Sequence, residues 1–349
     1  MSDRHGRRLI LLIGLAGFDT IMLIFSLVES LTAVYAERFL SGVFAAAVTP
    51  VALAAIGDLA ATEETRARRL TFVRLAGISG FLLGPMLGVA IARGASNIRA
   101  IPSAAGSLAT PLAATGILAL LVAIAAAVAV PGTHAGDTTP RIGRRPSERS
   151  GWLVPKLLVL AFIVSAGIGV FEVGLALRGK QELALTQYQI ALMFTECSLV
   201  MIVVQAIVFS PWVKPETTRW LIAPALSVLA AGLFLVARAS DFTLMLTVVG
   251  VVAASAGILS PILTYWVSRN AGHARGTDLG MQTAASSLGA AAGSAAGGLL
   301  FDVAPLLHAS FLLVTVLTVL GFLLSLGLPS QLVVRKRGGI AEARSAGTI

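Results

Sequence analysis

Charge is scarce in this sequence: only 12% of its 349 residues are Asp, Glu, Lys or Arg, whereas 56% are hydrophobic. A soluble domain carries about twice that charged fraction. Several apolar runs reach the roughly 20 residues that a helix needs to cross about 30 Å of hydrocarbon. A β-barrel would instead show alternating strands of about ten residues. The composition therefore predicts an all-α protein that crosses the membrane many times.

Cysteine and histidine are also rare. The single cysteine, Cys197, lies inside an apolar run, so we expect neither an intrachain disulfide nor a cysteine metal cluster. The histidines show no spacing typical of metal ligands. The sequence has no G-x-x-x-x-G-K-[ST] phosphate loop, and no soluble segment pairs a nucleophile with a base. We therefore expect no metal, no cofactor, no ATP-driven transport and no enzymatic activity.

The net charge is +9, but the cations stand in short loops between apolar runs. This distribution favours the positive-inside rule over a nucleic-acid surface, so nucleic acid is not an expected partner. The cations concentrate on one side of the membrane, which predicts that both termini are cytoplasmic. The apolar runs predict ten spans, at about residues 9–28, 33–57, 70–92, 109–130, 155–177, 188–210, 219–237, 242–264, 277–300 and 305–328.

The spans fall into two groups. Residues 1–130 carry four predicted spans and form an N-terminal bundle, and residues 155–330 carry six and form a C-terminal bundle. The segment 131–154 between them is rich in Gly, Pro, Thr, Ser and Arg, which is typical of a cytoplasmic linker. Residues 331–349 are basic and rich in small side chains, which predicts a disordered cytoplasmic tail.

Two glycine ladders stand at the same distance from a basic residue. Each begins fourteen residues after an arginine, the first after Arg66 and the second after Arg275. Glycines four residues apart lie on one helix face and let another helix approach closely. Matching ladders indicate equivalent helices in a duplicated transporter, in which the third span corresponds to the ninth. The ladders consist of Gly80, Gly84 and Gly88, and of Gly289, Gly293 and Gly297.

Four stretches resemble the major facilitator superfamily. The turn Asp3–Arg8 is similar to the D-R-x-G-R-R turn that joins helices 2 and 3 in that family. Residues 37–58 resemble its helix 4, in which an arginine precedes a glycine and an aspartate closes the inner end. Residues 80–88 resemble the helix 5 motif of the drug:proton antiporter branch. Residues 275–302 resemble helix 11.

The resemblance implies a fold of two helical bundles and a secondary transporter of the bacterial inner membrane. Its mechanism would be alternating access, its solute small and amphipathic, and its direction efflux driven by an ion, most simply H⁺. It also implies that the sequence begins at the third helix of the family. This leaves an alternative, a membrane protein without autonomous transport that serves as a scaffold, is a remnant, or needs a partner chain.

The resemblance further implies a gating latch at the cytoplasmic side. Asp3 would face the start of the ninth span, where the helix dipole favours an anion. Arg7 would pair with Asp58, and Arg66 belongs to the same cluster of charges. Together these groups would hold the outward-facing state. The alternative is that all four are solvated charges, because surface pairs contribute little.

The dipeptide Gly84-Pro85 predicts a helix kink, because proline removes a backbone donor. The resemblance implies that this kink and the flanking glycine ladder act as a pivot between the bundles, with the second ladder as its counterpart. The alternative is a tolerated kink, since Gly and Pro are frequent in membrane helices.

Four of the ionisable residues within the predicted spans are candidates for function, because such a group at membrane depth costs about 2.5–3.5 kcal/mol and should face a cavity or a partner. Glu196 stands at mid-span and is predicted to couple proton movement or to contact substrate, a task that suits a buried glutamate. Glu172 either lines the cavity or snorkels. Arg38 holds an anion or an acid, or ties two helices together. Asp19 makes a local hydrogen bond or takes part in coupling.

Overall fold

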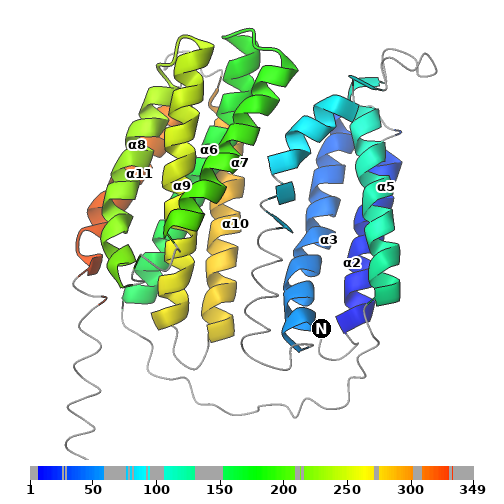
Figure 1. Cartoon of the computed structure of the whole chain (residues 1–349), viewed down its shortest axis with the longest axis horizontal. Helices are drawn as coiled ribbons and strands as arrows, with labels where there is room; N and C mark the ends of the chain where they lie inside the picture. Colours follow the sequence, from blue (N-terminus) through cyan, green and yellow to red (C-terminus); the bar gives the residue numbers. More distant parts are fainter. Residues whose placement is uncertain are drawn as a thin grey trace, which may run out of the picture. The chain divides into compact units, whose positions relative to one another are not determined.

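The computed structural model describes residues 7–25, 27, 30–58, 76–77, 79–80, 82–91, 93–94, 106–129, 152–208, 213, 216–270, 275–301, 309–329 and 332. Over these ranges the chain forms helices and turns and contains no β-strand, which confirms the predicted all-α class. The chain divides into two compact units, Met1–Ile142 and Gly143–Ile349 (Figure 1).

The first unit is built around α2, which packs against both α3 and α5. Two glycines allow this close packing. A Cβ atom on Gly17 would overlap the ring of Phe44 in α3, and one on Gly116 of α5 would lie 2.9 Å from the Leu23 side chain. The described helices of this unit are α2 (Arg7–Phe25), α3 (Leu31–Asp58), α5 (Gly106–Ala129) and the short apolar helix Leu82–Ile91.

The second unit is organised around α6, which contacts α7, α8, α9, α10 and α11. Its core is large and apolar, and Phe171, Trp266 and Phe311 are its bulkiest fully buried side chains. The elements of this unit are α6 (Leu153–Gln181), α7 (Gln187–Val208), the 3₁₀-helix η1 (Thr217–Leu221), α8 (Ile222–Val236), α9 (Phe242–Asn270), α10 (Arg275–Leu299) and α11 (Ala309–Ser325).

A described helix lies at each predicted span, with one local difference: the span predicted at 219–237 begins as the 3₁₀-helix η1 and continues as α8. By length and hydropathy, five helical stretches of the described chain can cross a membrane alone. These are Arg8–Phe25, Leu153–Gln181, Gln187–Val208, Thr217–Val236 and Phe242–Asn270.

Large apolar side chains cover the outside of the helices as well as the core. On α11, Phe311 and Val314 are buried, whereas Leu313, Val316 and Leu320 are more than half exposed. Exposing such a surface to water is unfavourable, whereas lipid hydrocarbon is as apolar as these side chains. The outward face of α11 is therefore suited to lipid.

The second glycine ladder lies at the contact between α10 and α6. A Cβ atom on Gly289 or Gly293 would overlap backbone atoms of α6, so only glycine permits this approach. The ladder residues Gly289, Gly293 and Gly297 face, in this order, Phe162, Ala166 and Val170. Because the residue numbers rise in the same direction along both helices, α6 and α10 run parallel.

The first ladder makes no such contact with the described residues. A Cβ atom on Gly80, Gly84 or Gly88 would meet no atom within 4 Å. The pivot built on these glycines and Pro85 therefore stays a prediction.

Candidate functional site

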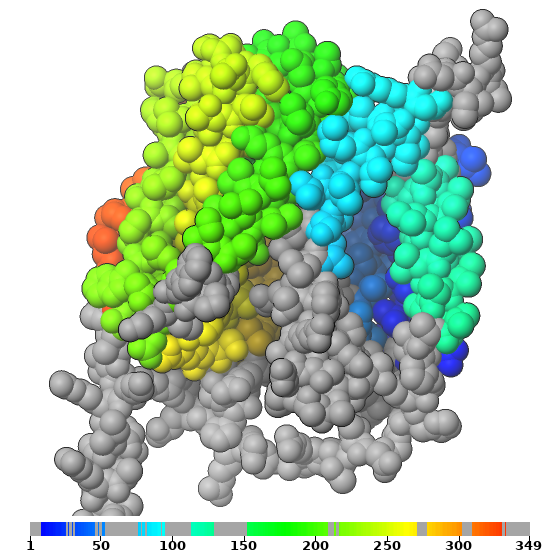
Figure 2. All heavy atoms as spheres, in the orientation of Figure 1, coloured from blue at the N-terminus to red at the C-terminus, as the bar shows by residue number. Residues whose placement is uncertain are grey.

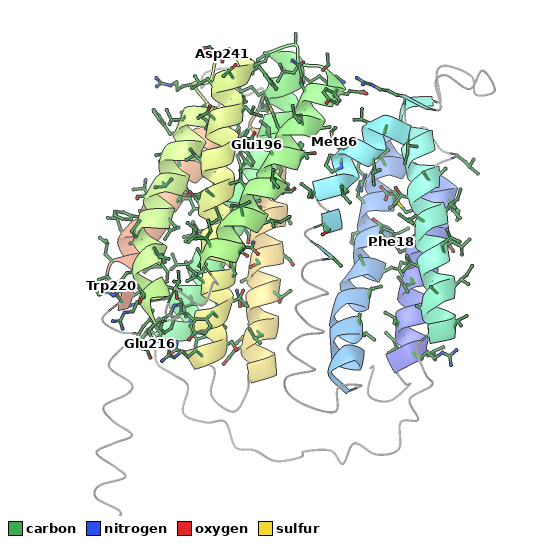
Figure 3. All side chains as sticks on the ribbon, viewed as in Figure 1. Phe18, Met86, Glu196, Glu216, Trp220 and Asp241 are labelled. Atoms are coloured by element: carbon green, nitrogen blue, oxygen red, sulfur yellow. The ribbon has the colours of Figure 1, made fainter. Side chains whose placement is uncertain are left out.

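Glu196 lies on α7 and reaches toward α9 (Figure 3). Its Oε1 atom is 3.3 Å from the position that a Cβ atom on Gly250 of α9 would occupy. Its Oε2 atom is shielded from solvent and has no hydrogen-bond partner among the described residues. A glycine at position 250 thus leaves room for a carboxylate that projects between two membrane helices.

The contact between α7 and α9 holds this carboxylate in place. Five residues beyond Glu196 along α7, the Met201 backbone lies 3.2 Å from where a Cβ atom on Gly257 would stand. The space-filling view shows the side chains of the two helices lying against each other (Figure 2). Glu196 therefore extends from a close helix–helix contact.

A second carboxylate joins Glu196 around a buried thiol. Cys197 is buried, and both Glu172 of α6 and Glu196 lie close enough to act on it electrostatically. The polar neighbours on α7 are already satisfied by their own helix, because the Thr195 hydroxyl donates to the Ala191 carbonyl at 2.9 Å. The structure thus brings Glu172 and Glu196 into one region of the second unit.

In the first unit, Asp19 is 2% exposed, and neither carboxylate oxygen has a hydrogen-bond partner among the described residues. The local hydrogen bond considered from the sequence is not present there. Asp19 belongs to α2, the helix that packs on both α3 and α5. Within the described part of this unit, an acid whose oxygens lack a partner thus lies inside the three-helix packing.

The sequence did not single out Glu37, the acid beside Arg38. Its side chain is 3% exposed, and Glu37 Oε2 lies 3.1 Å from Arg38 Nε. The guanidinium itself is largely exposed, with 69% of the side chain accessible. Adjacent residues on a helix do not normally face each other, so no spacing rule could have indicated this pair.

Two arginines assigned only to topology bind backbone carbonyls at helix ends. Arg8 Nη2 donates to the Ala127 carbonyl at 2.6 Å, near the end of α5. Arg178 is buried and donates to the carbonyls of Val236 and Ala239, while its Nε atom is 2.7 Å from Glu182. Cations at helix C-termini satisfy carbonyls that lack intrahelical partners.

The residues of the predicted latch cannot be compared with the structure. Asp3 and Arg66 lie outside the described residues, and the side chains of Arg7 and Asp58 are not among those described. In the part of the chain that is described, no cluster of three or more His, Cys, Asp or Glu side chains could hold a metal ion.

Each unit contains a helix of membrane length, and each contains acidic side chains within its own helix packing, which is typical of helical membrane transport proteins. The chain belongs to the Major Facilitator Superfamily, whose sequence pattern matches residues 1–281. This confirms the resemblance found in the sequence.

Several relatives are drug-resistance proteins of bacteria. Multidrug resistance protein 2 of Bacillus subtilis is 28% identical over 98% of this chain and 82% of its own length. Quinolone resistance protein NorA of Staphylococcus aureus is 23% identical over 87% of this chain and 76% of its own. The crystal structure of the human organic anion transporter MFSD10 (TETRAN) has the same fold, with a TM-score of 0.65 and 21% identity over 93% of this chain and 78% of that one.

Proposed function

We propose that this chain exports small amphipathic solutes across a bacterial inner membrane by alternating access, driven by proton entry. The similarity to bacterial multidrug resistance proteins supports efflux as the direction and drug-like molecules as the solute class. Both termini would lie in the cytoplasm, as the distribution of cations favours.

The observation that supports proton coupling is the Glu196 carboxylate at the contact of α7 with α9, whose Oε2 atom has no hydrogen-bond partner among the described residues. A charged group is costly at membrane depth unless it meets water, a partner or a proton. Glu196 would release its proton to the cytoplasm when the site opens inward and solute binds, and it would take up a proton from the outer side when solute leaves there. Glu172 would serve in the same region, because it shares the surroundings of Cys197 with Glu196.

The experiment is transport by the purified chain in proteoliposomes, with and without a pH gradient. Glu196→Gln should abolish pH-driven transport and leave solute exchange intact, because a neutral amide occupies the same space without releasing a proton. Asp241→Asn is the matched control. Asp241 Oδ1 accepts a hydrogen bond from the Leu244 backbone N–H at 2.7 Å at the start of α9, and asparagine caps helices equally well.

Two outcomes would contradict this proposal. Unchanged pH-driven transport in Glu196→Gln would show that Glu196 does not couple proton movement to transport. Absence of transport and exchange by the purified wild-type chain would instead favour a scaffold or a partner-dependent subunit.

We also propose a gating latch, which rests on the resemblance of these residues to the family motif. Asp3 and Arg7 would pair across the cytoplasmic side with the second bundle and with Asp58, beside Arg66. Asp3→Asn or Asp58→Asn should then increase the labelling of inward-facing cysteines by thiol reagents. Equal labelling of wild type and variants would count against the latch.

A further inference from the structure

Exposed tryptophans gather at one end of the second unit. Arg178 joins the end of α6 to the end of α8, so the starts of these two helices lie together at the opposite end. Trp152 precedes α6 and is 82% exposed, and Trp220 lies in η1 before α8 and is 58% exposed. Tryptophan prefers the boundary between hydrocarbon and water, because its ring is apolar and its N–H is polar. This end of the unit therefore lies at a membrane surface.

Two contacts fix η1 to the last turns of α9 at this surface. Glu216 Oε1 lies 3.1 Å from Arg269 Nη2, and Trp266 Nε1 donates to the Thr218 hydroxyl at 3.2 Å. Thr218 is 2% exposed. The residues that precede Arg219 are therefore held against the bundle, and Figure 3 shows Glu216 and Trp220 at the same end of the unit.

Arg219 takes no part in these two contacts. Its guanidinium lies 5.5 Å from the centre of the Trp220 ring. Its Nε atom is shielded from solvent and has no hydrogen-bond partner among the described residues. The neighbouring acid, Glu216, is already neutralised by Arg269.

We propose that Arg219 and Trp220 form a binding site for the headgroup of an anionic phospholipid. A guanidinium offers paired N–H donors that match the geometry of phosphate oxygens. The indole ring beside it would pack on the glycerol and the first methylenes of the lipid. Basic groups between membrane helices at the surface are the usual sites of anionic headgroups. The site depends on membrane insertion but not on the direction or coupling of transport.

The test compares binding of phosphatidylglycerol and phosphatidylcholine to the full chain in detergent, followed by native mass spectrometry of the retained lipid. Wild type should prefer phosphatidylglycerol. Arg219→Gln should lower that preference about fivefold, the effect of removing one basic residue at a membrane surface. Arg219→Lys keeps the charge but not the paired donors, and should give an intermediate preference.

Arg238→Gln is the matched control. Arg238 follows the other end of α8, and its guanidinium lies 4.9 Å from the Phe234 ring, so it repeats the cation–ring contact away from the tryptophans. It should keep the wild-type preference. The proposal is overturned if Arg219→Gln or Arg219→Lys retains the full preference, or if Arg238→Gln loses as much.

Discussion

Arg178 shows how much one residue contributes inside the second unit. It lies in the last turn of α6 and binds two carbonyls at the end of α8 and the carboxylate of Glu182. Its side chain is 7% exposed. Removing the guanidinium would leave these acceptors without a donor in a place that water reaches poorly, and unsatisfied buried groups are costly.

Arg178→Gln is therefore expected to destabilise the protein by about 3 kcal/mol. Arg178→Lys should recover only part of this, because an ammonium group cannot hold three acceptors in the fixed geometry of a guanidinium. Thermal unfolding in detergent measures both, with Lys180→Gln as a control at an exposed position of the same turn. A wild-type unfolding temperature for Arg178→Gln would refute the assignment.

Gly250 is a second single residue with a large expected effect, because its missing side chain leaves space for the Glu196 carboxylate. In Gly250→Ala, the added methyl would stand 3.3 Å from Glu196 Oε1 and displace the carboxylate by a few tenths of an ångström. We expect a changed pH dependence of transport with little loss of stability. Gly298→Ala is the control, since a Cβ atom there meets nothing within 4 Å. An unaltered pH profile in Gly250→Ala would show that the carboxylate tolerates the methyl.

Among the elements, α6 and α10 form the closest backbone contact that the structure describes. The glycines of α10 lie on the α6 backbone at Phe162 and Ala166, and Gly169 of α6 lies on the Ala290 carbonyl in return. Close packing with small residues on both sides is the main means of helix association in a membrane, where lipid is as apolar as the helices.

Gly293→Val is expected to force the two helices apart and to destabilise the second unit by about 3 kcal/mol, because the obstacle is backbone and cannot rotate away. Gly298→Val, five residues later on the open side of α10, should be nearly neutral. Unfolding in detergent, or the fraction of monodisperse protein after purification, distinguishes them. Equal behaviour of the two variants would show that the ladder is not a packing surface.

The sequence predicted the helices well, because in a long apolar run within hydrocarbon the backbone can satisfy its hydrogen bonds only by forming a helix. It also predicted that the second ladder lies at a helix contact, because spacing alone puts glycines on one face. It could not identify α6 as the partner, which depends on tertiary packing. Two polar contacts were not predicted. Arg178 was interpreted as a loop charge, and Glu37 stands beside Arg38 at a spacing that predicts no contact.

For the whole molecule, the orientation of the second unit in the membrane follows from its charges. Asp241 and Glu216 lie at opposite ends of this unit (Figure 3). The positive-inside rule predicts that the end with Arg219 and Arg269 lies in the cytoplasm. The same rule leaves Ser240, beside Asp241, facing outward.

Impermeant maleimides can test this orientation in intact cells. In a Cys197→Ser background, a cysteine at the exposed Ser240 should react directly, whereas one at the exposed Thr217 should react only after the membrane is permeabilised. Cys197 is the single cysteine of the chain, so its removal leaves no competing thiol. The reverse labelling pattern would invert the orientation.

The link from Arg178 to the end of α8 also has a consequence for biosynthesis. The Val236 carbonyl follows Arg178 by 58 residues, so this acceptor is synthesised well after α6. Until then the partner at hand is Glu182, which follows Arg178 by four residues and pairs with it at 2.7 Å. The full set of acceptors for the Arg178 guanidinium is therefore complete only once α8 packs beside α6.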